Sequence, residues 1–481
     1  MNSIQIILIW LSFVGFYQTI KPLPEGVNYS SEILNVSPAD IIFLNDLTYI
    51  DSDSNYVHDQ EIFESLIALI DSAEHYILID AFLFNSYKGP VDFSYRELSS
   101  ELAQKLIKKK TDFPDIKIDF ITDPINTFYG GSKIENLESI EAAGINVIYA
   151  DLKKLRDSTP LYSPIWRTFI QWFGNSDKYG LFPHPFSKHE QKVTLRSYFS
   201  FFNLKANHRK VALADNHGKI ISLITSANPH SASSAFSNVA VKIEGEFWKE
   251  IYATEKLVAA FSNDSLQGDF LFELTFGTSS AEGNTSIQFL TEKQTKDNLM
   301  INLAGTAAGD SISIAMFYFS NRDIIRTLLK AAERGVDIRL IIDPNKDAFG
   351  YPRNGLPNRP VANEFVKKSK GKINIRWYHT HGEQFHTKLI LIKKDSGKAV
   401  IMLGSTNLTR KNLENYNLES EVLIKTLTSS ELTRDITNYF DKIWFNQNGN
   451  YYTADYEKFQ DSSITKTIIY RIQEFTGLST Y

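Results

Sequence analysis

The chain repeats one pattern of chemically useful side chains, a His-x-Lys followed by a Ser-x-Asn. The repeated residues are His208, Lys210, Ser226 and Asn228 in the first copy, and His386, Lys388, Ser405 and Asn407 in the second. Residues two apart on a strand face the same side, so each copy offers an imidazole, an ammonium, a hydroxyl and an amide within a small area. One copy would mean little, because a histidine near a lysine is usually a surface or core pair. Two copies in the same order indicate one shared site.

These groups suit phosphoryl transfer without a metal ion. The lysines and asparagines would neutralise and hydrogen-bond the phosphate oxygens, and we expect Ser226 and Ser405 to bind phosphate as well. One imidazole would attack phosphorus and form a covalent phosphohistidine, while the other would protonate the leaving oxygen and then activate water or an alcohol. We expect no cofactor and no metal, because the histidines within residues 379–386 do not have a diagnostic ligand spacing.

Two similar series of strands and helices must position these groups. Strands alternating with helices predict an α/β fold. Because the series recurs, we expect a pseudo-duplicated α-β-α sandwich whose mixed, largely parallel sheets share one active site. The expected elements are a strand at 76–84, a helix near 102–109 and a strand at 116–121 in the first half, and a strand at 312–319, a helix at 323–334 closed by Gly335 and a strand at 336–342 in the second.

Length and spacing set the expected domain boundaries. A chain of 481 residues with 43% hydrophobic residues suits two packed domains. About 40 more residues separate Asp123 from His208 than separate Asp343 from His386, in excess of ordinary loop lengths. The excess is an aromatic insert that forms either a structural subdomain or a lid or membrane-contacting element. We expect a first domain over 35–262 with the insert at 151–200, a linker over 263–285, a second domain over 286–447 and a tail with a helix over 448–481.

The N-terminal segment 1–20 contains an apolar run at residues 4–17. This run predicts a secretory signal or a membrane anchor, with a buried core helix as the alternative. Little positive charge follows it, which favours an extracytoplasmic location in the cell envelope, either anchored or exported. The net charge of -5 gives no help to nucleic-acid binding, and the lack of cysteine excludes disulfides, thiolate zinc sites and a cysteine nucleophile.

Both motifs resemble those of the phospholipase D superfamily, His-x-Lys-x4-Asp followed by Gly-Ser-x-Asn, and the chain is similar to bacterial, cardiolipin synthase-like members. The resemblance extends from about Ile41 to Trp444. It implies metal-independent hydrolysis or exchange of phosphodiesters through a phosphohistidine, with Asp215 of the first motif in a structural role. The sequence departs from the family pattern twice, with Thr225 in place of glycine and Lys393 in place of the second aspartate.

The resemblance also implies a carboxylate that orients a motif histidine. Residues 417–419 match the family's Asn-x-Glu strand, whereas 238–240 lack an acid. A carboxylate partner raises the pKa of an imidazole, so Glu419 beside His386 would suit a general acid and leave His208 as the nucleophile. The expected catalytic residues are His208, Lys210, Asn228, His386, Lys388, Asn407 and Glu419.

The leading hypothesis is a phosphodiesterase that acts on phospholipids, by phospholipase D-type hydrolysis or phosphatidyl transfer. Its expected partners are the phospholipid, the membrane and a water or alcohol acceptor. A monomer suffices, because one chain carries both half-sites. The second hypothesis is an envelope or secreted nuclease of the same superfamily, which would require a basic groove. The third is an inactive membrane scaffold, and the retention of both histidines, both lysines and both asparagines argues against it.

Overall fold

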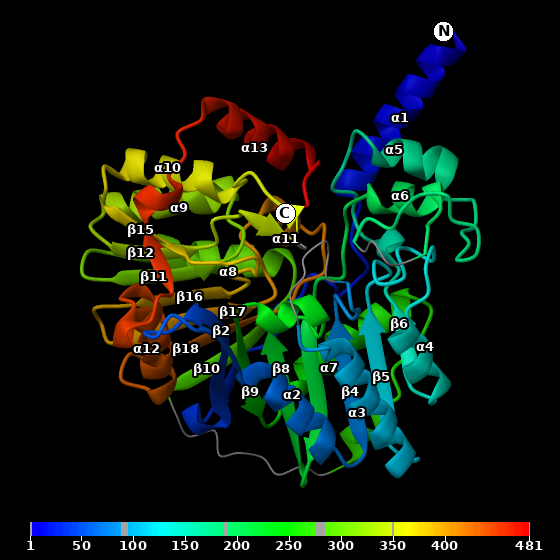
Figure 1. Ribbon diagram of the computed structural model, residues 1–481, viewed down its shortest axis with the longest axis horizontal. Helices are drawn as coiled ribbons and strands as arrows, with labels where there is room; N and C mark the ends of the chain where they lie inside the picture. Colours follow the sequence, from blue (N-terminus) through cyan, green and yellow to red (C-terminus); the bar gives the residue numbers. More distant parts are fainter. Residues whose placement is uncertain (1, 88–94, 187–190, 275–283, 349–350, 481) are drawn as a thin grey trace.

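The computed structural model describes residues 2–87, 95–186, 191–274, 284–348 and 351–480, and contains two large mixed sheets (Figure 1). The first sheet has, in spatial order, β3 (Tyr56–Gln60), β2 (Ile41–Ile50), β9 (Asn238–Glu244), β8 (Lys219–Thr225), β7 (Lys210–Asn216), β4 (Tyr76–Ala81), β5 (Lys117–Thr122) and β6 (Asn146–Tyr149). The second has β1 (Leu34–Val36), β10 (Thr285–Leu290), β18 (Glu421–Leu427), β17 (Lys398–Gly404), β16 (Lys388–Lys393), β11 (Ser311–Met316), β12 (Asp337–Ile342), β15 (Ile373–Tyr378) and β19 (Thr453–Asp455). The predicted α/β class is confirmed.

The two sheets share one strand order. The run β9-β8-β7-β4-β5-β6 in the first corresponds to β18-β17-β16-β11-β12-β15 in the second. Only β4-β5-β6 and β11-β12-β15 pair in parallel in these runs, and the other neighbours are antiparallel. The expectation of largely parallel sheets is therefore wrong. Each motif strand returns directly through a tight turn, and such a hairpin can join only antiparallel neighbours.

Helices cover the outer faces of both sheets. The first is covered by α2 (Glu61–Ser72), α3 (Leu98–Asp112) and α4 (Glu135–Ala142), and the second by α8 (Lys293–Ala304), α9 (Arg322–Glu333) and α10 (Asn358–Ser369). A third apolar cluster lies between the sheets and includes α7 (Trp248–Phe261) and α12 (Glu431–Trp444). Because strands of both sheets contribute to this central cluster, the two halves share a core that fixes the motif strands relative to each other.

Short strands near both ends of the chain join the second sheet. β1 pairs with β10, and β19 pairs with β15, so residues near the start of the expected first domain and residues of the expected tail extend the second sheet. The expected linker lies between α7 and β10, and its residues 275–283 lie outside the described residues. The tail helix is present as α13 (Ile464–Thr476).

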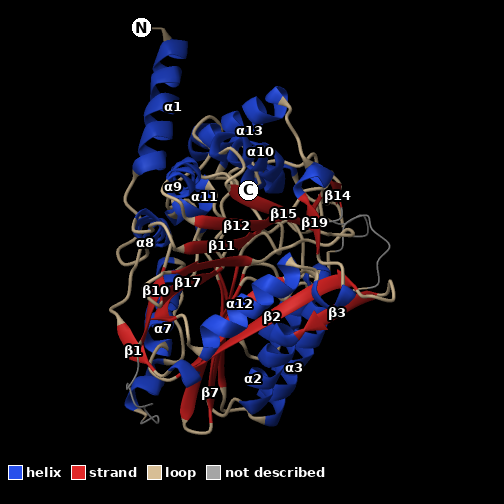
Figure 2. Ribbon diagram, turned by 90° about the vertical axis from the view of Figure 1, so that its left-hand side faces the viewer, coloured by secondary structure: helices blue, strands red, loops and turns tan. Residues whose placement is uncertain are grey.

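The N-terminal run forms α1 (Ser3–Ile20), which projects from the body of the protein (Figures 1 and 2). Only Val14 and Gly15 of this helix are buried, so a core helix is excluded. Among the described residues, α1 is the one helix that is long and apolar enough to cross a membrane. Its C-terminal part packs on the aromatic insert, which contains α5 (Ser163–Ile165), a π-turn at Trp166–Ile170 and α6 (Leu195–Phe201).

Candidate active site

One cavity is lined by both motif histidines. His208 lies just before β7 and His386 just before β16, and the two sheets bring these positions together. Asn228, which follows β8, and Asn407, which follows β17, line the same cavity, whose volume is about 170 Å³. The structure thus gathers two imidazoles and two amides from distant parts of the sequence around one small space.

Each histidine is held by the opposite half of the chain. The segment before β7 forms a parallel bridge with Leu418, and the backbone N–H of His208 donates to the Leu418 carbonyl at 2.9 Å. The segment before β16 forms the corresponding bridge between Phe385 and Ser237. A side chain that follows Leu418 is therefore placed beside His208, and one that follows Ser237 beside His386.

Glu419 contacts His208 and not His386, contrary to the predicted pairing. The Nδ1 atom of His208 lies 2.9 Å from Oε2 of Glu419. The same oxygen accepts a hydrogen bond from Ser405 Oγ at 2.5 Å, and the other accepts one from the amide of Asn412. A hydrogen bond at Nδ1 fixes the orientation of the imidazole ring. Nε2 is then the ring nitrogen that does not contact Glu419.

Asn238 holds the corresponding place beside His386. Its Oδ1 lies 3.2 Å from Nδ1 of His386 and accepts a hydrogen bond from Ser226 Oγ at 3.1 Å. The structural counterpart of Glu419 is thus Asn238, two residues before the expected Ala240. The asymmetry seen in the sequence exists, but it falls on the opposite histidine, because each half orients the imidazole of the other.

The two motif serines are positioned to support these contacts. Ser226 and Ser405 are fully buried, and neither is among the residues that line the cavity. Each hydroxyl has one proton to donate, and it is donated to Asn238 or Glu419. The contacts therefore assign the serines to positioning, in place of the phosphate binding that we expected.

The motif lysines lie beneath the cavity and not in its wall. Nζ of Lys210 donates to the His208 carbonyl, and Nζ of Lys388 donates to the His386 carbonyl, both at 2.7 Å. Each ammonium also lies against an aromatic ring, 5.0 Å from the centroid of Phe82 and 5.3 Å from that of Phe317. These two rings do line the cavity. Sequence reasoning missed them, although each is the first residue after the strand that pairs with the motif strand of its half, β4 or β11.

Asn228 and Asn407 are available to a ligand. The side-chain oxygens of both amides are buried and have no hydrogen-bond partner among the described residues. Buried polar groups are normally satisfied, so two matching unpaired amide oxygens in one cavity indicate a polar ligand that completes their hydrogen bonding.

Burial and mutual repulsion favour an anion in this cavity. Burial first, and then the nearby lysines, lower the pKa of both His208 and His386 well below the usual range. Burial also lowers the pKa of Lys210 to about 7 and raises that of Glu419 to about 8. A bound phosphate would counter the shifts of the bases, because negative charge stabilises their protonated forms.

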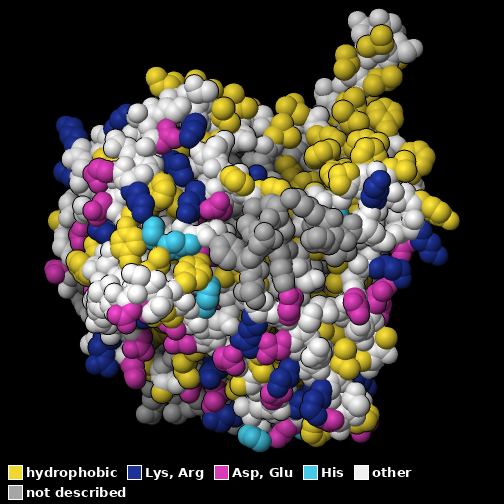
Figure 3. All heavy atoms as spheres, in the orientation of Figure 1, with side chains coloured by type: hydrophobic (Ala, Val, Ile, Leu, Met, Phe, Trp, Pro, Cys, Tyr) yellow, Lys and Arg dark blue, Asp and Glu magenta, His cyan; other side chains and the backbone are white. Residues whose placement is uncertain are grey.

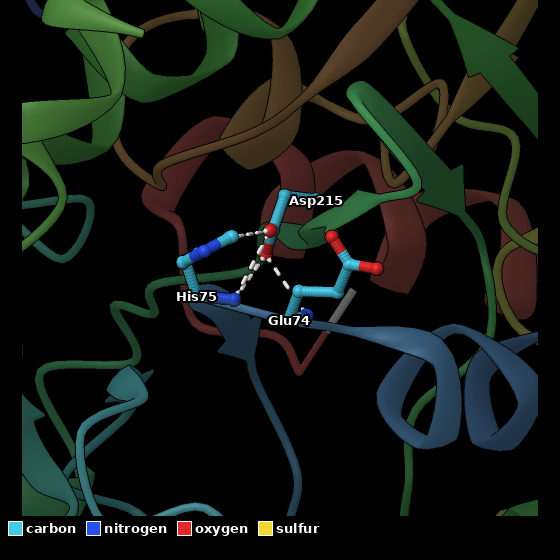
Figure 4. Close-up of side chains that lie close together, drawn as sticks. All are labelled: Glu74, His75 and Asp215. Carbon is cyan, nitrogen blue, oxygen red and sulfur yellow. Dashed lines mark hydrogen bonds and ion pairs between the residues drawn. The ribbon is translucent and has the colours of Figure 1, made fainter.

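Asp215 holds the start of β4, as its expected structural role requires (Figure 4). Its carboxylate accepts the backbone N–H groups of Tyr76 at 2.7 Å and His75 at 2.9 Å, and also contacts Nδ1 of His75 at 2.7 Å. Glu74, His75 and Asp215 are also close enough together to hold a metal ion. Because the Asp215 oxygens already accept these protein hydrogen bonds, we assign the group to holding the turn.

The second half, which lacks the motif aspartate, holds its turn with Asp310. One oxygen of Asp310 accepts the N–H of Asp395 at 2.9 Å, and the other accepts that of Ala307 at 3.0 Å. The carboxylate is thus supplied from the segment before β11 instead of from the end of β16, and Asp395 lies in the turn away from the cavity.

A buried ionic network joins the halves directly behind the histidines. The Arg209 guanidinium is fully buried and lies 3.1 Å from both Glu255 and Glu292. Glu292 also accepts the backbone N–H of Glu419 at 3.0 Å. Arg209 follows His208 in the chain, so this network connects the positions of His208 and Glu419. The sequence offered only a charged residue inside an apolar strand pattern as an indication.

Comparisons with known proteins agree with this architecture. A family model described as "Cardiolipin synthase, PLD-like domain" matches residues 300–444. The crystal structure of phosphatidylserine synthase from Haemophilus influenzae Rd KW20 is 11% identical, covers 97% of this chain and 98% of that chain, and gives a TM-score of 0.58. No curated protein matches the chain.

Two further solved structures are similar over part of their length or with lower scores. Polyphosphate kinase from Porphyromonas gingivalis is 12% identical, covering 96% of this chain and 56% of that one, with a TM-score of 0.45. Nuc from Salmonella typhimurium, a phospholipase D family member, is 21% identical, covering 36% of this chain and 97% of that one, with a TM-score of 0.27.

The fold is therefore that of a two-domain, phospholipase D-like protein. The region that matches the PLD-like domain model includes His386, Asn407 and Glu419.

Proposed function

We propose that the protein is a phosphodiesterase that acts on phospholipids, by phospholipase D-type hydrolysis or by phosphatidyl transfer. The observation that carries the proposal is the composition of the cavity wall. Two imidazoles and two amides, whose NH₂ groups can donate to phosphate oxygens, share the cavity with an apolar wall, and a phospholipid combines an anionic phosphodiester with apolar chains. The apolar wall includes Phe82, Phe186, Phe201, Leu204, Phe236 and Phe317.

In the proposed reaction His208 is the nucleophile. Its Nε2 attacks phosphorus, the bond from phosphorus to the leaving oxygen breaks, and a phosphohistidine forms. The phosphorylated ring is cationic when Nδ1 keeps its proton. This positive charge favours the ionised form of Glu419 beside Nδ1, and the carboxylate stabilises the cation in return. The assignment of His208 is the one that the sequence suggested, but its physical reason is the presence of Glu419 and not its absence.

His386 is the general acid and base. Its Nδ1 faces the neutral amide oxygen of Asn238, and the lysines and His208 lower its pKa, so its protonated form is a strong acid. It gives a proton to the leaving oxygen in the first step. In the second it takes a proton from water or an alcohol, whose oxygen attacks phosphorus as the bond to His208 breaks.

A lipid substrate also agrees with the charges around the cavity. Its lining includes Lys205, Lys411 and Arg353. Lys205 bonds the Leu152 carbonyl and Asp157, and Lys411 bonds a backbone carbonyl, so both are engaged within the protein. A nuclease would need a continuous basic path for the nucleic-acid backbone.

The test is a parallel assay of the full chain on phosphatidylcholine, phosphatidylglycerol, single-stranded DNA and bis-p-nitrophenyl phosphate. We expect release of headgroup or transfer to added alcohol from a lipid, with an acid-labile phosphoenzyme that disappears in His208→Ala. Cleavage of DNA without cleavage of either lipid would favour the nuclease. Absence of phosphoenzyme with all four substrates would favour the scaffold.

A further inference from the structure

Helix α13 turns its apolar side away from the protein. Ile464, Ile468, Ile472 and Phe475 are spaced so that they share one face of the helix, and each is between 53% and 81% exposed. Isolated exposed apolar residues are ordinary, but a contiguous stripe on one helix marks a surface that has a partner.

Polar contacts on the opposite face fix this orientation. Glu474 is buried and accepts hydrogen bonds from Ser320 Oγ at 2.7 Å and from the backbone N–H of Arg410 at 2.9 Å. The buried hydroxyl of Tyr470 accepts one from Arg322 at 2.9 Å. Rotating the helix to bury its isoleucines would break these bonds, so the apolar stripe is a fixed outer surface.

The aromatic insert forms a second exposed apolar surface. Trp172 is 75% exposed and Leu181 is 80% exposed. Other exposed members of this surface are Leu161, Ile165, Phe169, Phe173 and Tyr179. The insert is joined to α1, because Nε1 of Trp10 donates to Thr168 at 3.2 Å. Figure 3 shows hydrophobic side chains continuing from α1 over the adjoining surface.

The segments that carry the two apolar surfaces also reach the cavity that holds the histidines. α1 and α13 lie at the same end of the molecule in both views (Figures 1 and 2), and Figure 1 places α5 beside the lower part of α1. The segment after α13 contributes Thr480 to the cavity wall, and α6 of the insert contributes Phe201. The α13 stripe and the insert therefore lie on the two halves of the protein that meet at the cavity.

We propose that the α13 stripe and the exposed face of the insert form one docking surface for a lipid bilayer, with α13 lying in the plane of the membrane interface. This surface would place the cavity against the bilayer, so that a phospholipid could reach the histidines without crossing water. The inference deepens the proposed function by naming its membrane partner, but docking itself is measured without catalysis.

The geometry of α1 points to a bilayer as the occupant. Its 18 residues extend for about 27 Å, close to the ~30 Å hydrocarbon core of a bilayer. The part from Trp10 onward, about 16 Å long, runs beside the insert, since Gln18 accepts the N–H of Asp157. If α1 enters the membrane along most of its length, the insert must enter the interface with it. The α13 stripe at the same end is then brought to the membrane surface.

The absence of cysteine makes the docking surface directly measurable. Full-length Ile472→Cys and Leu181→Cys would be labelled with an environment-sensitive fluorophore and reconstituted with vesicles of equal amounts of phosphatidylcholine and phosphatidylglycerol. Ile301→Cys is the matched control, because Ile301 is 70% exposed on α8, a helix that belongs to neither apolar surface. We expect blue-shifted emission and quenching by nitroxide-labelled lipids at 472 and 181, and neither at 301.

Two results would overturn the proposal. If the label at 181 is quenched by the lipids but that at 472 is not, α13 does not contact the bilayer. If the label at 472 is shielded equally in detergent without lipid, with a mass that corresponds to two chains, the stripe is covered by a second copy.

A kinetic arm separates docking from catalysis. The double variant Ile468→Ser/Ile472→Ser should lower turnover of vesicle lipid by about tenfold, because less apolar area enters the interface. Its turnover of dissolved bis-p-nitrophenyl phosphate should be unchanged, and Ile301→Ser should change neither. If the wild-type protein cleaves no lipid while the label at 472 is quenched, the proposed function fails and docking stands. If the wild-type protein and the double variant cleave vesicle lipid equally, docking through α13 is refuted, but the proposed function is not.

Discussion

Replacing Glu419 by glutamine tests which histidine the carboxylate serves. Glutamine keeps the shape of the side chain and one carbonyl oxygen, which can still accept from His208 and Ser405. It removes the carboxyl group that can ionise beside Nδ1 of His208 when the ring becomes cationic. It also turns an NH₂ group toward the amide of Asn412, which in the wild type donates a hydrogen bond to Glu419. We expect some loss of stability, on the order of 1 kcal/mol, from this last contact.

The size of the kinetic effect follows from the hydrogen bond that changes. A hydrogen bond to a charged group contributes about 1.5–3 kcal/mol, and one between neutral groups about 0.5–1.5 kcal/mol. Loss of about 1–2 kcal/mol of stabilisation of the cationic phosphohistidine corresponds to roughly a 5- to 30-fold slower formation. Because the nucleophile acts in every first step, the factor should be the same whether the leaving group is good or poor.

The assay compares single-turnover phosphoenzyme formation from a phospholipid and from bis-p-nitrophenyl phosphate. Glu419→Gln should slow both by a similar factor. Asn238→Ala is the matched variant on the other histidine, and it should slow the lipid more, because p-nitrophenolate leaves without a proton whereas an alcohol needs one. If Glu419→Gln slows only the lipid and leaves the p-nitrophenol burst unchanged, then His208 is the acid and the proposed roles are reversed.

Four further outcomes can be measured on the same protein. Asp215→Asn should lower the free energy of unfolding by about 2–3 kcal/mol, because charge-assisted hydrogen bonds to the β4 turn are weakened, with activity per folded molecule unchanged. Arg209→Met should cost about 3–5 kcal/mol by leaving buried carboxylates unpaired, and adding Glu255→Gln and Glu292→Gln should restore part of the loss. Activity should survive EDTA, because lysines and amides supply the field at the phosphate; loss that zinc reverses would contradict this. Burial raises the pKa of Glu419 from 4.5 to about 8, so the folded state favours the protonated form and loses stability as pH rises between these values. The Glu419→Gln variant does not have this loss. The melting temperature of the variant minus that of the wild type should therefore increase between about pH 5 and about pH 8.

The sequence predicted the elements well where the pattern is local. The strands β4, β5, β11 and β12 and the helix α9 agree with the expected ranges within a few residues, because buried strand runs and a Gly335 stop signal are local features. The direction of strand pairing was not predicted correctly. Parallel pairing was inferred from strand–helix alternation, whereas the motif strands are joined by hairpins whose turns were recognised only in part.

The pairing of Glu419 was wrong for a different reason. Aligning the two halves on the Asn-x-Glu motif placed the counterpart of Glu419 at Ala240. The hydrogen bonds to Ser226 and Ser405 place this counterpart at Asn238. Contacts between the halves depend on how two sheets meet, and neither sequence pattern contains that information. The same limit explains why Arg209 was not recognised as part of the interface.

The departure at Thr225 is also explained only by pairing. Thr225 lies opposite Ala240 on β9, whereas Gly404 lies opposite Glu421 on β18. A Cβ atom on Gly404 would lie 2.2 Å from the Ser420 carbonyl oxygen, so the second half requires glycine at this position. In the first half the larger threonine is matched by a smaller partner on the neighbouring strand.

The two halves have the same strand order, but they differ in the side chain that each places beside the histidine of the other half. The second half supplies a carboxylate to His208, and the first supplies only an amide to His386. Two imidazoles in equivalent backbone positions therefore have different partners, which suits them to the different roles that we propose. This difference needs both halves, because each orienting side chain crosses the interface. A change that shifts the halves apart, such as loss of the Arg209 network, should disturb both histidines before either half unfolds.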